Sequence, residues 1–380
     1  MHLLRLGWTL GAALLVVACA KQATSPSVNA APTPSVSSAP TAAPAAEVKG
    51  LANPTSDPAT VLLANNALAC KWKPDCTGHG CPKDQLDLTP DEGCAGVKTW
   101  RSAKIAGTDA GDATLVNMLE DRDVRVRLLG AWQLSFGPHG AWASNRELAR
   151  RVIAAAAAES EEGNQIAALA GAVADINYDA TGLWPDAKAA VEAPSHSLMK
   201  SIVLNAIGKY NAASEVVWQW ALANAKASNG SGASYLAHFH TARQADVCTV
   251  LGELLVEKPN TGFAAQELTA EGNGCPSSIE PALAATEAFL TKDFVRDWGW
   301  VSAAENTHKN RGASAQQKAR AADALAAMAR ESRSQGVYRA EALRRLHRLD
   351  KAKASALAAT LGQDKNAEVA GAVKEVLASK

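Results

Sequence analysis

From residue 109 to the C-terminus, apolar side chains recur with an almost unbroken helical period, and this pattern restricts the fold more than any other feature. Its clearest example is residues 115–134, LVNMLEDRDVRVRLLGAWQL, which are typical of the end of one helix, a polar turn at 120–123 and a second amphipathic helix. Apolar residues three and four positions apart share one face of a helix, so each helix needs a neighbour to cover that face. The chain contains no convincing run of alternating β-branched residues. The pattern therefore predicts an all-α fold.

Parts of this hairpin recur downstream, which indicates internal repetition. Gly130-Ala131-Trp132 in the second helix is matched by Gly171-Ala172-Val173, 41 residues later, and by Gly371-Ala372-Val373, 200 residues further on. Gly208 and Gly252 lie near the intervening steps, and residues 364–369 are a looser copy of the Asp-x-x-Val-Arg turn at 121–125. Small residues allow helices to approach closely, while Val, Leu and Trp fill the layer between them. We therefore expect a helix-pair unit of about 40 residues.

A helix-pair period near 40 residues resembles HEAT-like repeats, a family whose members fold as right-handed α-solenoids. The resemblance covers residues 109–380, and residues 224–313 fit it least because their loops are long and their spacing is irregular. It implies an α-solenoid over this range. The alternative is a non-repetitive helical domain.

The N-terminus has the features of an export sequence. Arg5 precedes an apolar run at 6–17 that is too short to span a bilayer comfortably, and the run ends in Val16-Val17-Ala18-Cys19. Small residues before a cysteine resemble the lipobox of bacterial lipoproteins. That resemblance implies a signal peptide at 1–19, cleavage before Cys19 and three acyl chains that anchor Cys19 in a lipid bilayer. An ordinary signal peptide or membrane anchor is the alternative.

The residue after Cys19 is Ala20 and not the aspartate that retains many lipoproteins at the inner membrane, so the resemblance favours the outer membrane.

Residues 20–57 are rich in Ala, Pro, Ser and Thr and contain no aromatic residue, which predicts a disordered tether. Residues 58–108 follow as a small Cys-rich helical segment. It is expected to begin with Asp57 as N-cap and Pro58 in the first turn, and a capping-box spacing at Thr89 and Glu92 predicts another helix start.

Six cysteines remain if Cys19 is lipidated, and an even number in an exported chain predicts disulfide bonds. Pairing Cys248 with Cys275 leaves three ways to pair the other four, which are Cys70, Cys76, Cys81 and Cys94. Two groups of residues could form a metal site instead. Cys76-x-x-His79-x-Cys81 groups soft ligands. His238 and His240 would share a face only in an extended segment, whereas the pattern there predicts a helix. The prediction is disulfides and no metal site.

The chain has ten tryptophans, against four tyrosines and five phenylalanines. Two pairs lie two residues apart, Trp218 with Trp220 and Trp298 with Trp300. The second pair lies within residues 224–313, where the repeat is least regular, and the first pair lies just before that range. One interpretation places all four in the helical core. The other places one of them, or the loop at 297–300, on an exposed surface that binds protein or stacks on a glycan.

The sequence contains no HExxH, GxSxG, P-loop or GxGxxG motif, so we expect no catalytic residue and no cofactor. With 38 basic and 38 acidic residues, the chain has no electrostatic feature that favours nucleic acid as a partner. These observations favour a non-catalytic, lipid-anchored envelope protein whose repeat surface binds another envelope protein. Two alternatives are a glycan- or peptidoglycan-binding protein or enzyme that uses the Trp-rich middle, and a purely structural envelope component.

Overall fold

The computed structural model describes residues 56–75, 87–136, 140–159, 164–193, 197–207 and 211–379. These residues form the helices α2–α19, four short 3₁₀ segments and one two-stranded sheet, which confirms the predicted all-α class. The chain divides into two compact units, Met1–Asn211 and Ala212–Lys380. This division falls inside the range 109–380 that the sequence assigned to one repeat domain.

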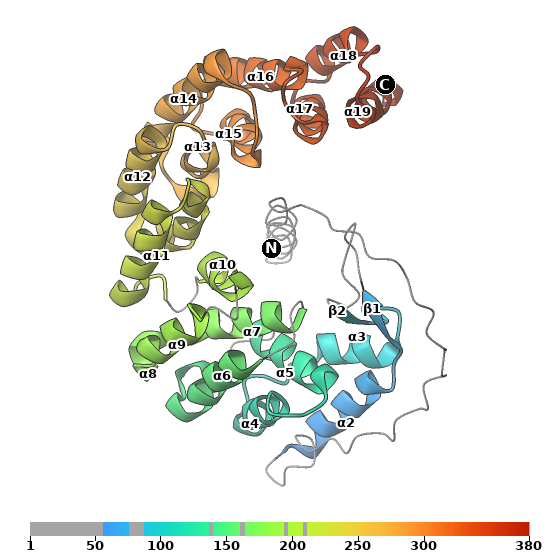
Figure 1. Cartoon of the computed structure of the whole chain (residues 1–380), viewed down its shortest axis with the longest axis vertical. Helices are drawn as coiled ribbons and strands as arrows, with labels where there is room; N and C mark the ends of the chain where they lie inside the picture. The colour runs from blue at the N-terminus through green and yellow to red at the C-terminus, as the bar shows by residue number, and fades with distance from the viewer. Residues whose placement is uncertain are drawn as a thin grey trace, which may run out of the picture. The chain divides into compact units, whose positions relative to one another are not determined.

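The helices of the first unit pack as two rows (Figure 1). In one row α5 contacts α7 and α7 contacts α10; in the other α4 contacts α6 and α6 contacts α9. The rows join where α4 packs on α5 and α6 on α7. The elements of this unit are α2 (Pro58–Leu68), β1 (Trp72–Asp75), β2 (Asp87–Pro90), α3 (Ala95–Ser102), α4 (Asp109–Met118), α5 (Val124–Phe136), η1 (Ala141–Ser144), α6 (Arg146–Ala158), α7 (Asn164–Asp175), α8 (Tyr178–Thr181), α9 (Trp184–Val191) and α10 (Ser197–Ala206).

The hairpin expected at residues 115–134 is formed by α4 and α5. Between them, the carboxylate of Asp121 accepts a hydrogen bond from the backbone N–H of Asp123 at 2.8 Å, and Asp123 in turn accepts one from the N–H of Arg125 at 2.9 Å. Arg127 extends from α5 to Glu159 at the end of α6, with 2.8 Å between Nε and the nearer carboxylate oxygen. Side-chain acceptors in the turn thus bind N–H groups at the start of α5, and an ion pair links α5 to the end of α6.

The Cys-rich segment packs into the first unit. Asp57 caps α2 as expected, accepting from the N–H of Thr60 at 2.8 Å. The helix start expected at Thr89 is wrong, because Thr89 lies in β2, which pairs antiparallel with β1, and α3 begins only at Ala95 with Cys94 as N-cap. The buried indole of Trp100 donates to the carbonyl of Leu129, which ties α3 to α5.

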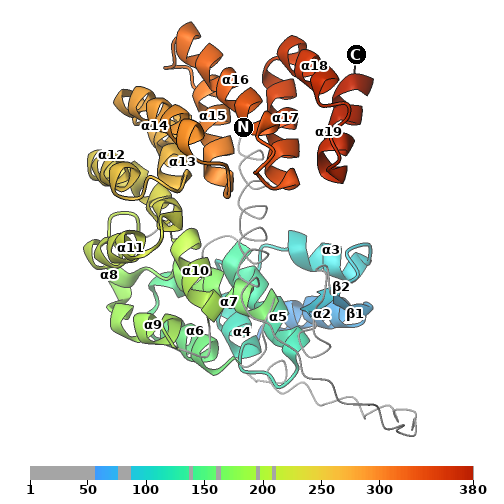
Figure 2. The ribbon, with the colours of Figure 1, turned by 45° about the horizontal axis from the view of Figure 1, so that its top comes forward.

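The helices of the second unit also form two rows, visible in Figures 1 and 2. In one row α13, α15, α17 and α19 contact one another in succession; α12, α14, α16 and α18 lie in the other, and α16 packs on both α15 and α17. The elements are α11 (Glu215–Ala227), η2 (Ser231–Phe239), α12 (His240–Glu257), α13 (Phe263–Thr269), η3 (Glu271–Asn273), η4 (Pro276–Ser278), α14 (Ile279–Lys292), α15 (Trp298–Lys309), α16 (Ala315–Arg330), α17 (Gly336–Leu349), α18 (Lys351–Thr360) and α19 (Ala367–Ala378).

The contact between α13 and α15 depends on two glycines. A Cβ atom on Gly299 would lie 2.3 Å from the carbonyl carbon of Gly262, and one on Gly262 would lie 2.1 Å from the backbone nitrogen of Trp300. At the other end of the same pair, the Asn310 side-chain amide donates to the carbonyl of Thr269 at 3.0 Å. The missing side chains allow close packing, and the asparagine provides a partner for a carbonyl at the end of α13.

The glycines of the repeated triplets, and Gly252 near an intervening step, do not share one role. A Cβ on Gly130 would lie 2.9 Å from the carbonyl oxygen of Leu115, and one on Gly171 would lie 2.0 Å from the hydroxyl of Ser135. Nothing lies within 4 Å of the corresponding position on Gly252 or Gly371. Close helix approach therefore explains the first two glycines and not the last two.

This difference predicts opposite effects of the same substitution. Gly371→Ala should raise the free energy of unfolding by about 0.5–1 kcal/mol, because alanine favours the helical backbone and meets open space. Gly130→Ala should lower it by about 1–3 kcal/mol, because the methyl group overpacks the contact with α4. Urea denaturation followed by circular dichroism measures both, and a shift of the two midpoints in the same direction would contradict the assignment.

Candidate functional site

The four candidate binding tryptophans are mostly core residues. Trp218, Trp220 and Trp300 are 4%, 6% and 1% exposed, so the interpretation of these three as surface anchors is wrong. Trp298 is half-buried and packs its ring edge-on against Tyr338, with 4.8 Å between the ring centroids. Only Trp298 keeps any appreciable surface for a ligand.

Aromatic packing explains the burial. Trp300 stacks on Phe289 from the other row of the second unit, with centroids 4.5 Å apart, and Trp218 meets Phe239 edge-on at 5.2 Å. Residues 297–300 do not form a loop, because Asp297 is the N-cap of α15 and accepts from the N–H of Gly299 at 2.8 Å. Burial raises the pKa of Asp297 above its usual value, although the backbone N–H groups favour its charged form.

The expectation of disulfide bonds is confirmed. The structure pairs Cys70 with Cys94 and Cys248 with Cys275, with Cα atoms 6.1 and 5.7 Å apart. Cys70–Cys94 links the end of α2 to the N-cap of α3, and Cys248–Cys275 links α12 to the segment between η3 and η4. Several expectations concern residues outside the described ranges: the signal peptide, the tether up to residue 55, lipidation at Cys19, and the roles of Cys76, His79 and Cys81.

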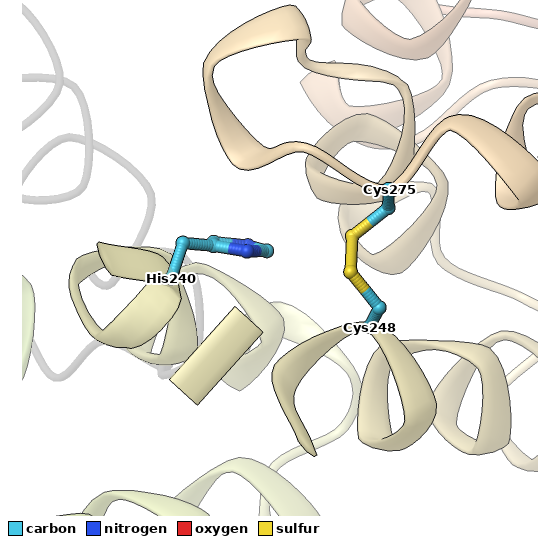
Figure 3. Close-up of side chains that lie close together, drawn as sticks. All are labelled: His240, Cys248 and Cys275. Carbon is cyan, nitrogen blue, oxygen red and sulfur yellow. A yellow bond between two sulfur atoms is a disulfide. The ribbon is translucent and has the colours of Figure 1, made fainter. Parts of the chain in front are cut away.

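The two candidate histidine ligands diverge. His238 belongs to the 3₁₀ segment η2, and His240 is the first residue of α12, so they do not share the face of an extended segment. His240 is 6% exposed and lies beside Cys248 and Cys275; a ring nitrogen and the two sulfur atoms all lie within 4.8 Å of one another (Figure 3). Burial lowers the pKa of His240 to about 4; the backbone of Asn273 opposes this shift only partly.

A second cluster, which sequence inspection missed, lies between α15 and α17. Glu305 on α15 is buried, and its two carboxylate oxygens meet Lys309 Nζ at 2.6 Å and Arg345 Nη1 at 2.8 Å. Arg345 also pairs with Glu341 at 3.0 Å, and Arg348 lies 3.3 Å from Glu341 and 3.6 Å from Glu305. We call these five residues the charged seam.

The charged seam combines a buried anion with half-exposed cations. The side chain of Glu305 is 5% exposed, whereas those of Lys309 and Arg348 are 49% and 50% exposed. Burial alone would raise the pKa of Glu305, but the hydrogen bond from Lys309 and the charges of Arg345, Lys309 and Arg348 outweigh it, and the net pKa lies below the usual value. The two i, i+4 pairs of the charged seam, Glu305–Lys309 and Glu341–Arg345, can be recognised in the sequence. The contact between α15 and α17 cannot.

Comparison of the chain with protein-family models, with curated proteins and with solved structures finds no match. The HEAT-like and lipoprotein resemblances therefore rest on the residues quoted above. Among the described residues, no helix has both the length and the apolar character that crossing a membrane requires.

The lowered pKa of Glu305 predicts an acid-sensitive contribution to stability. Near neutral pH, Glu305→Gln should lower the free energy of unfolding by about 2 kcal/mol, because it weakens hydrogen bonds from charged groups in a buried site. The folded-state pKa is depressed, so the wild-type advantage is present above the unfolded-state value of 4.5 and is lost as pH falls through the folded-state value. Urea titrations from pH 3 to pH 7 measure the difference.

Glu257→Gln is a suitable control for this measurement, because Glu257 is exposed at the end of α12. It should change stability by no more than about 0.5 kcal/mol. A difference between wild type and Glu305→Gln that stays constant from pH 3 to pH 7 would show that the carboxylate charge is not what stabilises the seam.

Proposed function

We propose that this chain is a non-catalytic, lipid-anchored envelope protein whose helical-repeat surface binds another protein. The charged seam is the observation that most supports this proposal. It presents Lys309 and Arg348 about half exposed on two neighbouring helices of one row, above a buried carboxylate that holds them in place.

The α-solenoid is part of the same proposal. From α4 to α7 and from α12 to α19, successive helices alternate between two rows, as stacked hairpins would. The turn before α5 and the turn before α19 each contain the same type of hydrogen bond. Asp121 accepts from the N–H two residues later at 2.8 Å, and Asp364 accepts from the N–H two residues later at 3.0 Å. A stack of this kind exposes one continuous face of each row, which is the surface that repeat proteins use for binding.

The geometry of the seam suits a protein partner that carries carboxylates. Lys and Arg side chains normally lose rotamer freedom when they bind, which costs affinity. Here Lys309 is already held by Glu305 and Arg348 by Glu341, so part of that entropy is lost before the partner arrives. Guanidinium groups bind carboxylates in a fixed geometry, and arginine is common among the residues that dominate interface energies.

The binding test uses the purified chain as bait for chemically crosslinked envelopes. Wild type should recover one consistent partner, and Lys309→Ala with Arg348→Ala should reduce its recovery at least tenfold. Arg150→Ala is the matched control, because Arg150 is 51% exposed on α6 and pairs with Glu147, outside the seam. Recovery of only lipid and abundant porins, or equal recovery by the seam variant, would contradict the proposal.

The anchor is tested separately. Cys19→Ala should move the protein from the membrane pellet to the soluble fraction after cell disruption, because the acyl chains would have no attachment point. Fractionation followed by immunoblotting measures this. Retention in the pellet after a carbonate wash would contradict the lipoprotein assignment. It would not bear on the binding proposal, which the crosslinking experiment tests separately.

A glycan-binding function has less support. It required exposed tryptophans in the middle region, and three of the four candidates are buried. Trp298, the half-buried one, is occupied by Tyr338 on one side. The observations therefore favour the charged seam over an aromatic glycan platform.

A further inference from the structure

His240 is a buried side chain whose ring nitrogens make no hydrogen bond of normal geometry with the described residues. It is 6% exposed. Figure 3 shows the imidazole pointing at the Cys248–Cys275 disulfide, and the donor atoms of the three residues all lie within 4.8 Å of one another. This arrangement is separate from the charged seam and independent of the protein-binding proposal.

An unpaired imidazole in the interior requires an explanation. Leaving a buried polar group without a partner costs about 1–3 kcal/mol, and most such groups in native structures are satisfied. A disulfide is a poor hydrogen-bond partner, and the backbone of Asn273 acts on the ring without a hydrogen bond of normal geometry. A third component that uses the nitrogen lone pair would remove this cost.

The fold brings the three residues together from two segments. In a straight helix, His240 and Cys248 would lie about 12 Å apart along the axis. The backbone of α12 is non-helical at Arg243, so the turn that carries His240 is kinked relative to the rest of the helix. Cys275 comes from the segment between η3 and η4, where the Gln244 side chain donates to the carbonyl of Gly274.

We propose that His240, Cys248 and Cys275 form a zinc site that exists only when the disulfide between the two cysteines is reduced. Two thiolates and one imidazole nitrogen are ligands that Zn²⁺ prefers. Bonds of about 2.0–2.3 Å in a tetrahedral arrangement set ligand atoms about 3.3–3.8 Å apart, so the imidazole needs to move by only about 1 Å. The Cα atoms of the cysteines, 5.7 Å apart, leave room for the sulfur atoms to separate by side-chain rotation.

The charges of this site balance in a buried environment. Two thiolates neutralise the dication, and the imidazole is neutral, so the filled site has no net charge and avoids the cost of an isolated buried ion. The described residues supply three ligands, and a water molecule would take the fourth position, as in zinc sites with three protein ligands.

The conversion between the two states needs a dithiol reductant. A thiolate of the reductant attacks the sulfur of Cys248, which is more exposed than that of Cys275, and the Cys248–Cys275 bond breaks as a mixed disulfide forms. The second thiol of the reductant displaces Cys248, so two electrons pass to the protein, which is left with two thiols, and the reductant leaves as a disulfide. Binding of Zn²⁺ then releases two protons, one from each thiol.

The two states join the same elements by different bonds. The disulfide and the zinc site each connect α12 to the segment before η4, so the second unit keeps a crosslink at this position in both redox states. Oxidation of the thiolates would expel the metal. The cluster therefore acts as a redox-dependent zinc site, taking up the ion when reduced and releasing it when oxidised.

The main experiment measures zinc protection of cysteines in the full chain. The protein is reduced, freed of reductant without oxygen, and alkylated with iodoacetamide with and without one equivalent of Zn²⁺; peptide mass spectrometry follows each cysteine. Zinc should slow alkylation of Cys248 and Cys275 at least tenfold. Cys70 and Cys94 are the internal control, because they are also one buried and one half-buried cysteine, and the described residues place no histidine beside them as His240 lies beside Cys248 and Cys275.

Cobalt identifies the ligands. Reduced wild type with Co²⁺ should show thiolate-to-cobalt charge transfer and the intense visible bands of tetrahedral cobalt, and the oxidised protein should show neither. His240→Ala should weaken Co²⁺ binding at least tenfold, whereas His238→Ala should leave it unchanged. If His240→Ala fails to fold, His240→Gln keeps a side chain of similar reach without the imidazole.

Three results would overturn the proposal. The first is equal alkylation of Cys248 and Cys275 with and without zinc. The second is protection confined to the N-terminal cysteines Cys70, Cys76, Cys81 and Cys94. The third is a cobalt spectrum that survives replacement of both Cys248 and Cys275 by serine, because the metal would then lie elsewhere.

Discussion

The close packing of short helices against neighbours of the same row is the constraint on which the rest of this structure depends. Most of its helices have between seven and fourteen residues, a length at which an isolated helix is marginal in water. Gly262 and Gly299 show how the contact is made, since either Cβ would displace the backbone of the partner segment. Asn306 and Asn310 then donate to carbonyls of α13, so polar groups at this contact have partners.

In rows of short helices, many charged side chains lie near the contacts between helices. Such a side chain can be buried where another helix supplies its hydrogen-bond or ion-pair partner. Arg339 on α17 is 5% exposed; it donates to the carbonyl of Ala329 at the end of α16 and pairs with Asp364 in the turn before α19, so it links all three. Glu305 in the charged seam follows the same rule. His240 differs, because its ring nitrogens make no hydrogen bond of normal geometry with the described residues and lie close to the sulfur atoms of Cys248 and Cys275, and that exception is what supports a metal site there.

Local features of the fold were predictable, and contacts between distant segments were not. The hairpin at residues 115–134 and the cap at Asp57 depend on side chains within three positions of the groups they bind. The spacing of Trp218 and Trp220 did not predict their burial, because residues two apart on a helix point in different directions. Both are buried since α11 has neighbouring segments on more than one side. The helix start at Thr89 was wrong because pairing of β2 with β1 holds that segment extended.

The sequence by itself determined the all-α class, the ends of several helices and the presence of disulfide bonds, because helix period, capping and cysteine usage depend on neighbouring residues and composition. Only the tertiary structure decided that ion pairs form between α15 and α17, that Cys70 pairs with Cys94, and that the ring of His240 lies beside Cys248 and Cys275. These residues are between 8 and 40 positions apart, and the distance between them depends on how whole helices pack and where α12 kinks. That information lies in the packing, and no local pattern contains it.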